Sequence, residues 1–333
     1  MAVSTAGKSV KIVVLDGFTL NPGDNPWDAV AQLGELTVHD RTARELTLER
    51  ASGAAILLTN KTLLDAATLA ALPGLRYVSV LATGFNVVDV AAAGRLGIPV
   101  SNVPEYASAT VAQHVFALLL ELTNRVGRHD AAVKDGEWSR CPDFSFCSGS
   151  LVELTGLTLG LVGFGRIGRC VANIANAFGM RVIAHTPHPP SSADEPPVDF
   201  VPLAELFATA DVVSLHCPQT SENAGFVDGP LLAGMKPSAF LINTARGGLV
   251  NEHDLAEALN REKLAGAAVD VVSCEPIVAD NPLLSARNCL ITPHLAWAAL
   301  AARKRLMSQT AANIAAFLDG NPVNLVNSRE LGR

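Results

Sequence analysis

The sequence has few charged residues, few aromatic residues and no long apolar run. Charged residues make up 17% of the 333 positions and aromatic residues 5%. The 25 basic residues are outnumbered by 32 acidic ones, so the basic excess typical of a nucleic-acid-binding protein is absent. No apolar run approaches the roughly 18 residues that a membrane-spanning helix needs. We therefore expect neither nucleic acid nor a membrane as a partner.

Cysteine is sparse, and its spacing matches no known framework. The six cysteines are Cys141, Cys147, Cys170, Cys217, Cys274 and Cys289. No two of them have the C-x-x-C spacing of a zinc or redox site, and six in this length do not indicate a disulfide scaffold. The first ten residues contain one lysine and precede no long apolar stretch, so they do not resemble a secretory signal. We expect a reduced, cytoplasmic protein with no metal site.

Hydrophobic residues make up 49% of the chain, which is enough for the cores of two domains. Each of the two regions alternates short β-branched runs with helical stretches. In the first hundred residues the predicted strands are 11–15, 54–58, 76–81 and 98–100, and the predicted helices are 27–33 and 62–71. In the second region the predicted strands are 158–162, 181–185, 212–216, 239–243, 267–270 and 289–292. This alternation predicts an α/β protein with two doubly wound parallel sheets.

Two long helices are predicted near the ends of the second region. One covers residues 105–125 and the other residues 297–318, with Gly320 as a left-handed cap and Pro322 as a stop. Residues 126–150 show no helical period, and we expect them to be irregular.

A glycine-rich loop follows the strand predicted at 158–162. Gly163, Gly165 and Gly168 form a G-x-G-x-x-G pattern that opens a helix, which is the context in which this pattern indicates a dinucleotide site. The first glycine permits the tight turn, the second lets the backbone approach a pyrophosphate, and the third allows close helix–strand packing. The helix N-terminus then attracts the anion, and Arg166 can assist.

The acid that usually follows the next strand of such a unit is missing. Thr186 stands where an Asp or Glu would bind the ribose hydroxyl of NAD, and Ser191 and Ser192 follow. A missing carboxylate removes the repulsion against a 2′-phosphate, but no Arg or Lys is present there to bind one. NAD is the expected cofactor, and NADP remains open.

An Arg, a Glu and a His follow three of the predicted strands. Arg246, Glu275 and His294 should therefore lie at the carboxyl edge of the sheet, where ligands of such sheets bind. Arg246 can bind a carboxylate with two hydrogen bonds and polarise a neighbouring carbonyl. His294 can exchange a proton with the carbonyl oxygen, while Glu275 orients its ring and favours its charged form. This set of residues suits hydride transfer at a carbonyl.

Over nearly its whole length the sequence resembles the D-isomer-specific 2-hydroxyacid dehydrogenase family. The supporting stretches are Gly163 to Gly168, Asn243 to Gly248, Asp270 with Glu275-Pro276, and Thr292-Pro293-His294. The resemblance implies a Rossmann cofactor domain, residues 105–296, inserted into a flavodoxin-like substrate domain, residues 1–104 plus 297–333. It also implies that Arg246, Glu275 and His294 are the catalytic residues.

The resemblance implies further contacts. It assigns cofactor binding to Gly163, Gly165, Arg166, Ile167, Gly168, Thr186, Cys217, Pro218, Thr244, Ala245 and Asp270. It assigns binding of the substrate carboxylate to the backbone of Thr83, Gly84 and Phe85, opposite Arg246. It implies a homodimer in which residues 126–150 lie near the interface. His114, on the helix at 105–125, is expected to be a packing residue.

Within the family, the chain is most similar to the glycerate dehydrogenase, or hydroxypyruvate reductase, branch. The features are the Ala82 to Asn86 loop, Gly136-Glu137-Trp138, and Trp297 three residues after His294. The expected reaction is reversible reduction of hydroxypyruvate or glyoxylate to the D-2-hydroxy acid. A phosphorylated substrate is disfavoured because the Thr83–Phe85 loop has no basic residue, and formate oxidation because that branch has Gln in place of Glu275. The alternative from another class is a dinucleotide-sensing regulatory protein with little turnover.

Overall fold

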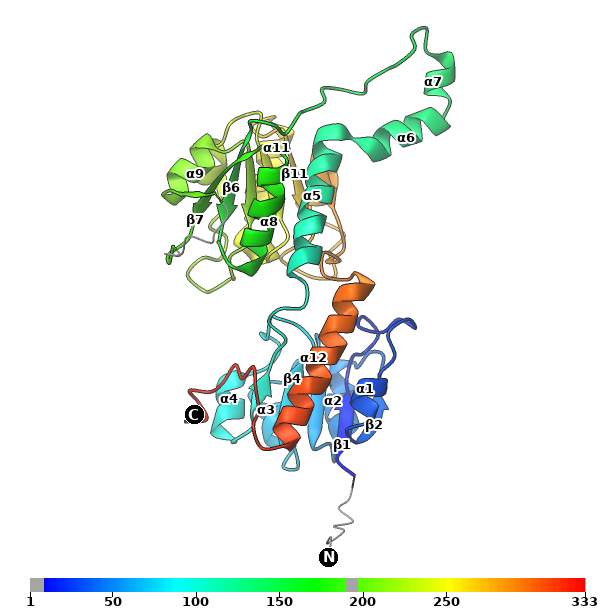
Figure 1. Ribbon diagram of the computed structural model, residues 1–333, viewed down its shortest axis with the longest axis vertical. Coiled ribbons are helices and arrows are strands. Elements are labelled where there is room, and N and C mark those ends of the chain that lie inside the picture. The colour runs from blue at the N-terminus through cyan, green and yellow to red at the C-terminus, as the bar shows by residue number, and fades with distance from the viewer. Residues whose placement is uncertain (1–8, 190–196, 333) are drawn as a thin grey trace, which may run out of the picture. The chain divides into compact units, whose positions relative to one another are not determined.

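The protein divides into two compact units in a computed structural model that describes residues 9–189 and 197–332. One unit comprises the chain up to Ala107 and from Ala298 onward, and the other runs from Ser108 to Trp297 (Figure 1). Each unit contains one parallel sheet with helices on both faces, which confirms the predicted α/β class.

The first unit contains a five-stranded sheet in the order β2-β1-β3-β4-β5, the flavodoxin-like order. Its strands are β1 (Lys11–Val14), β2 (Glu35–Val38), β3 (Ile56–Thr59), β4 (Tyr77–Val80) and β5 (Val100–Ser101). Its helices are α1 (Asp28–Ala31), α2 (Thr47–Ala51), α3 (Ala66–Ala70), α4 (Val90–Arg95) and α12 (Leu300–Leu318).

Two helix layers cover this sheet. Residues of α2, α3 and α4 share one apolar core with β1, β3 and β4. On α12, Phe317 stacks on the buried Tyr77 of β4, with 4.4 Å between ring centroids. The predicted cap at Gly320 is confirmed by its φ of +82°.

The second unit contains a seven-stranded sheet in the order β12-β11-β10-β9-β6-β7-β8, the doubly wound order of Rossmann folds. Its strands are β6 (Thr158–Val162), β7 (Arg181–His185), β8 (Asp199–Phe200), β9 (Val212–Leu215), β10 (Phe240–Asn243), β11 (Gly266–Val269) and β12 (Cys289–Ile291). Its helices are α5 (Ser108–Asn124), α6 (Val126–Lys134), α7 (Glu137–Arg140), α8 (Arg166–Ala177), α9 (Leu203–Thr209), α10 (Gly229–Ala233) and α11 (Glu252–Asn260).

Alternate residues of these strands face two separate apolar cores. One core is completed by α5 and α8, and the other by α9, α10 and α11 (Figure 1). In β6, for example, Leu159 and Leu161 face the first core and Val162 faces the second. Because both faces are covered, the central strands β6, β9, β10 and β11 are buried at every residue except Thr158, as expected of a parallel sheet.

The prediction that residues 126–150 are irregular is confirmed for 141–150 and wrong for 126–140, because that part contains α6 and α7. Arg125 adopts a left-handed conformation, with φ of +53°, which ends α5 and starts α6 in a new direction. Neither α6 nor α7 buries a side chain, and they extend away from the sheet of their own unit (Figure 1). Without a core-facing side they carry no apolar period that a sequence pattern could reveal.

Candidate active site

The carboxyl edge of the seven-stranded sheet contains the switch point expected of a ligand site. The central strand β6 has β7 on one side and β9 on the other, so the connections that leave β6 and β9 diverge there. The loop after β6 contains Gly163 and Gly165 and leads directly into the N-terminus of α8.

The three glycines of this loop fit a dinucleotide pyrophosphate. A Cβ at Gly163, where φ is +98°, would lie 2.7 Å from the backbone nitrogen of Cys217, and one at Gly168 would lie 2.6 Å from the carbonyl oxygen of Gly163. Because neither position has room for a side chain, glycine at both lets the loop pack closely. Within the described part of the chain no atom lies within 4 Å of a Cβ at Gly165, which is exposed. The backbone at Gly165 is thus open to a ligand at the positive end of the α8 dipole.

The residues predicted beside the loop lie at the ends of the neighbouring strands. Thr186 follows β7, and its hydroxyl accepts a 3.4 Å hydrogen bond from the backbone of His188. Cys217 and Pro218 follow β9 and His216, whose backbone donates to Val162. Burial raises the pKa of the Cys217 thiol and lowers the pKa of His216 to about 4, so both groups are neutral at pH 7. Ser191 and Ser192 lie outside the described residues.

Arg246 is exposed at the end of the loop that follows β10. Asn243 shapes this loop: its side chain accepts from the Ala245 backbone at 3.0 Å and donates to the Arg246 carbonyl at 2.8 Å. A Cβ at Gly247 would lie 1.9 Å from the Val272 carbonyl carbon, so only glycine lets this loop pack against the segment that leads to Glu275. The Thr244 hydroxyl is buried and has no hydrogen-bond partner among the described residues.

His294 and Glu275 form a direct pair. Nδ1 of His294 lies 2.6 Å from Oε2 of Glu275, and the two side chains are 28% and 31% exposed. A carboxylate accepts hydrogen bonds only, so Nδ1 carries the proton and Nε2 is the atom left to exchange a proton with a ligand. Since β10, β11 and β12 are neighbours, Arg246, Glu275 and His294 follow three adjacent strands at one edge.

The backbone around His294 is held by Asp270. His294 has φ of +53°, an uncommon conformation for a residue with a side chain. Its backbone nitrogen donates to the Asp270 carbonyl at 2.7 Å, and the Asp270 carboxylate accepts from the backbone of Leu295 and Ala296 at 2.9 Å each. Burial raises the pKa of Asp270, but hydrogen bonds from His114, Thr292 and these amides outweigh it and hold the pKa below its ordinary value.

His114, expected to be a packing residue, is mostly buried and also makes a polar contact. Nε2 of His114 lies 3.1 Å from the Thr292 hydroxyl, which in turn lies 2.6 Å from Oδ1 of Asp270. A histidine among the apolar residues of a helix gives no signal of such a partner, because Thr292 lies 178 residues further along the chain.

Glu252, at the start of α11, is a second residue that sequence reasoning missed. Its carboxylate accepts from the Ser273 backbone at 2.6 Å, from the Ser273 hydroxyl at 2.8 Å and from the Asn281 amide at 2.8 Å. These bonds fix the loop that contains Glu275. Glutamate in the first turn of a helix is common, so it does not by itself indicate a long-range contact.

Thr83, Gly84 and Phe85 belong to the first unit, where they follow β4. The Thr83 hydroxyl donates to Val103 at 2.9 Å, and the Asn102 amide donates to the Thr83 carbonyl at 2.7 Å. Thr83 and Phe85 are exposed. Over residues 9–189 and 197–332, no group of three or more His, Cys, Asp or Glu side chains has the arrangement of a metal site, and no helix is long and apolar enough to cross a membrane.

Comparison with known proteins agrees with this geometry. Residues 116–296 match the family model described as D-isomer specific 2-hydroxyacid dehydrogenase, NAD binding domain. The hydroxypyruvate reductase of Blautia hydrogenotrophica is 46% identical over 96% of this chain and 100% of its own length. The glycerate dehydrogenase of Methylorubrum extorquens is 38% identical over 85% and 89%.

Solved structures show the same two-unit fold. The TT0316 protein of Thermus thermophilus matches with a TM-score of 0.84 at 36% identity, over 95% of this chain and 100% of that one. An Aquifex aeolicus D-lactate dehydrogenase complexed with NAD and lactic acid matches with a TM-score of 0.83 at 28% identity, over 95% of this chain and 99% of that one. An NADPH-dependent glyoxylate/hydroxypyruvate reductase of Sinorhizobium meliloti, in complex with NADP and malonate, matches with a TM-score of 0.82 at 26% identity, over 97% of this chain and 98% of that one. The chain therefore belongs to the D-isomer specific 2-hydroxyacid dehydrogenase family, in its glycerate dehydrogenase and hydroxypyruvate reductase branch.

Proposed function

We propose that this protein is an oxidoreductase that reduces a small 2-keto acid, hydroxypyruvate or glyoxylate, to the D-2-hydroxy acid with a reduced nicotinamide dinucleotide. The observation that supports this most directly is the 2.6 Å His294–Glu275 pair on the strand edge that also carries Arg246. The relatives are named for the reactions they catalyse, so the comparisons do not favour the dinucleotide-sensing alternative.

The proposed mechanism assigns one task to each side chain. Arg246 binds the substrate carboxylate with two parallel hydrogen bonds and draws electron density from the adjacent carbonyl. When bound, the dinucleotide supplies the hydride. His294 donates the Nε2 proton to the carbonyl oxygen, and in oxidation the same nitrogen takes a proton from the hydroxyl. Glu275 keeps the proton on Nδ1 and stabilises the charged ring, which is the form that donates.

The proposal extends to binding residues implied by family membership. Gly163, Gly165, Arg166, Ile167, Gly168, Thr186, Cys217, Pro218, Thr244, Ala245 and Asp270 are assigned to the cofactor. Thr83, Gly84 and Phe85 are assigned to the substrate carboxylate. The unit from Ser108 to Trp297 is the cofactor domain in this proposal, and the other unit is the substrate domain.

Initial rates test the reaction. Hydroxypyruvate, glyoxylate and pyruvate are each reduced with NADH and with NADPH, and His294→Ala is measured in parallel. We expect fast reduction of hydroxypyruvate or glyoxylate by the wild type. In His294→Ala we expect turnover to fall by roughly 10²–10⁴-fold, the range of general acid catalysis, with dinucleotide affinity retained. Tight dinucleotide binding with no turnover of any keto acid would favour the sensing alternative instead.

For the cofactor, we propose NAD(H) with NADP(H) also accepted. The support is Thr186, a neutral residue where a carboxylate would repel a 2′-phosphate. Thr186→Asp should therefore reduce kcat/KM for NADPH at least tenfold, about 1.4 kcal/mol, and leave that for NADH within a few-fold. An unchanged ratio of NADH to NADPH use in this variant would show that Thr186 does not set the preference.

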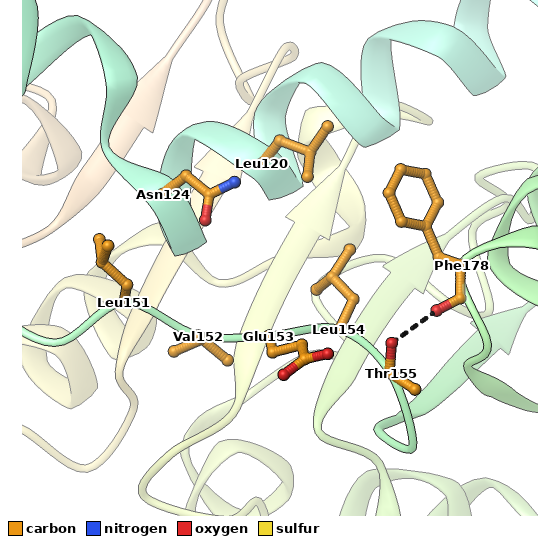
Figure 2. A pocket seen from close by; sticks show the side chains of 8 residues that line it. All are labelled: Leu120, Asn124, Leu151, Val152, Glu153, Leu154, Thr155 and Phe178. Carbon is orange, nitrogen blue, oxygen red and sulfur yellow. Dashed lines mark hydrogen bonds between the residues drawn. The ribbon is translucent and has the colours of Figure 1, made fainter.

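We also propose a homodimer formed through the cofactor domain, with the segment 126–150 near the interface. The support is apolar exposure on and beside this segment: Val126 is 61% exposed, Trp138 52%, Phe144 91% and Leu151 54%. A hollow of about 430 Å³ lies beside the segment and is lined by Leu120, Leu151, Leu154 and Phe178 among others. Figure 2 shows the side chains that line it. Apolar surface of this kind marks an interface when it is contiguous.

Light scattering after size exclusion tests the dimer. The wild type should have twice the mass of the 34.8 kDa chain. Phe144→Asp should shift the mass toward the monomer, whereas Arg44→Asp, at a side chain of the first unit that is 79% exposed, should not. A wild type that runs as a monomer at all concentrations contradicts the proposal.

A further inference from the structure

A chain of hydrogen bonds connects helix α5 to the turn that presents His294. It starts at His114, whose side chain is 16% exposed, and passes through the Thr292 hydroxyl to the Asp270 carboxylate, which is 0% exposed. Nε2 of His114 also lies 3.6 Å from Oδ1 of Asp270. None of these groups is needed for the proton transfer itself, so their arrangement requires another explanation.

The direction of each bond follows from the donors available. The Thr292 hydroxyl has one proton, and the 2.6 Å contact with an acceptor-only carboxylate uses it. The same oxygen must then accept from His114, so Nε2 of His114 carries a proton. His114 is therefore a donor that holds the hydroxyl of Thr292 in the rotamer pointing at Asp270.

Asp270 in turn determines the backbone on both sides of the His294 side chain. Its carbonyl accepts from His294, Oδ1 accepts from Leu295, and Oδ2 accepts from Ala296. Three consecutive amides thus bond to one residue. A conformation as uncommon as φ of +53° persists only where the surroundings determine it, and these bonds supply that constraint.

We propose that His114 is a positioning residue that acts through Thr292 and Asp270 to hold His294 in the orientation that meets Glu275. The inference rests on the proposed function, since it assigns His114 a part in keto-acid reduction. Family membership implies that Asp270 contacts the cofactor, and this inference gives Asp270 a second role. Both of its carboxylate oxygens accept hydrogen bonds from the turn that contains His294.

Three variants separate positioning from packing. His114→Leu fills the space but removes the donor, His114→Gln restores an N–H near the position of Nε2, and Thr292→Val removes the hydroxyl at nearly constant shape. Misplacement of a catalytic group by about 1 Å can cost as much as 10²-fold. We expect His114→Leu and Thr292→Val to lower kcat at least tenfold, with KM for the dinucleotide little changed, and His114→Gln to recover most of the loss. Gln113→Leu, at the exposed neighbouring position on α5, is the matched control and should leave kcat unchanged.

A double variant tests whether the two groups act in series. If His114 works only through Thr292, then His114→Leu combined with Thr292→Val should lower kcat no further than either change alone. Multiplicative losses would mean that the two side chains act independently, and the proposal would be wrong. Equal kcat in His114→Leu, Gln113→Leu and the wild type would also overturn it.

A spectroscopic readout keeps this inference separate from the proposed reaction. The proton between Nδ1 of His294 and Glu275 should give a downfield imidazole resonance, assigned by its absence in His294→Ala. This resonance should shift or broaden in Thr292→Val and His114→Leu and persist in His114→Gln. Such a change in a protein that reduces no keto acid would leave the positioning role intact and reject the reaction. An unchanged resonance, with normal kcat, would reject the positioning role alone. If His114→Leu fails to fold, His114→Met replaces it in the same comparisons with His114→Gln and Thr292→Val.

Discussion

Replacing Glu252 by Gln tests how far the loop that contains Glu275 depends on a residue outside the sheet edge. Glu252 accepts three hydrogen bonds, two from Ser273 and one from Asn281. Glutamine keeps one acceptor oxygen and presents a donor in place of the other, so at least one of these three donors loses its partner. Asn281 is 5% exposed, so water cannot readily replace the lost acceptor there.

The magnitude follows from these contacts. A hydrogen bond to a charged group contributes about 1.5–3 kcal/mol, so losing one should lower the free energy of unfolding by about 2 kcal/mol. Glu275 lies two residues beyond Ser273, so a loosened Ser273 also loosens the contact between Glu275 and His294. Because a displacement near 1 Å can cost up to 10²-fold, we expect kcat to fall about tenfold. Dinucleotide affinity should stay the same, since the loop after β6 is untouched.

The assay combines urea unfolding with initial rates of keto-acid reduction. Glu257→Gln is the matched control: it makes the same change on α11, at an exposed pair 2.8 Å from Arg261 with side chains 56% and 71% exposed. A pair of that kind contributes about 0.3–0.5 kcal/mol. If Glu252→Gln is no less stable and no slower than Glu257→Gln, then the three bonds do not hold the loop and the reasoning is refuted.

Three further predictions follow from the same geometry. Arg246→Lys should lower kcat/KM for the keto acid by about 100-fold, because an ammonium cannot form the paired hydrogen bonds of a guanidinium. Unchanged dinucleotide affinity, measured by fluorescence titration, would confirm that the loss is specific to the substrate. Gly165→Ala should weaken dinucleotide binding without loss of thermal stability, since no described atom lies within 4 Å of the new methyl group. Gly163→Ala should instead destabilise the fold, since its methyl group would lie 2.7 Å from the backbone nitrogen of Cys217. Equal melting temperatures for the two variants would contradict this. The pKa of His216 is lowered to about 4 from an ordinary 6.5, so as pH falls the unfolded chain binds this proton first, and the free energy of unfolding should fall between about pH 6.5 and 4 by up to about 3 kcal/mol. Urea unfolding at pH 7 and 4.5 measures this loss, and His216→Gln should remove that part of it; identical pH dependence in the two proteins would refute the assignment.

The strands that the sequence predicts are those with apolar or β-branched runs. Residues 158–162 and 181–185 were predicted with the bounds that β6 and β7 have, because continuous apolar runs are typical of central parallel strands. Two edge strands were missed. β2 (Glu35–Val38) alternates between exposed and half-buried positions, and β8 (Asp199–Phe200) is two exposed residues long. Neither of these two has the continuous apolar run of a buried strand, so its side chains give little signal.

The candidate site also has one part that the sequence predicts and one part that it does not. The positions of Arg246, Glu275 and His294 at strand ends follow from chain order, because each lies a few residues after an apolar run. The turn that orients His294 does not follow from chain order: it depends on Asp270, 24 residues earlier, and on His114, which reaches it through Thr292 from a different helix. Glu252 acts on the loop before Glu275 across a separation of 21 residues. A motif can therefore predict which side chains gather at the edge of the sheet, because a strand end is a local feature. It cannot predict which residues hold them in place, because those contacts form only once distant parts of the chain pack together, and this is why His114 and Glu252 are the substitutions whose effects would reveal most about how the site works.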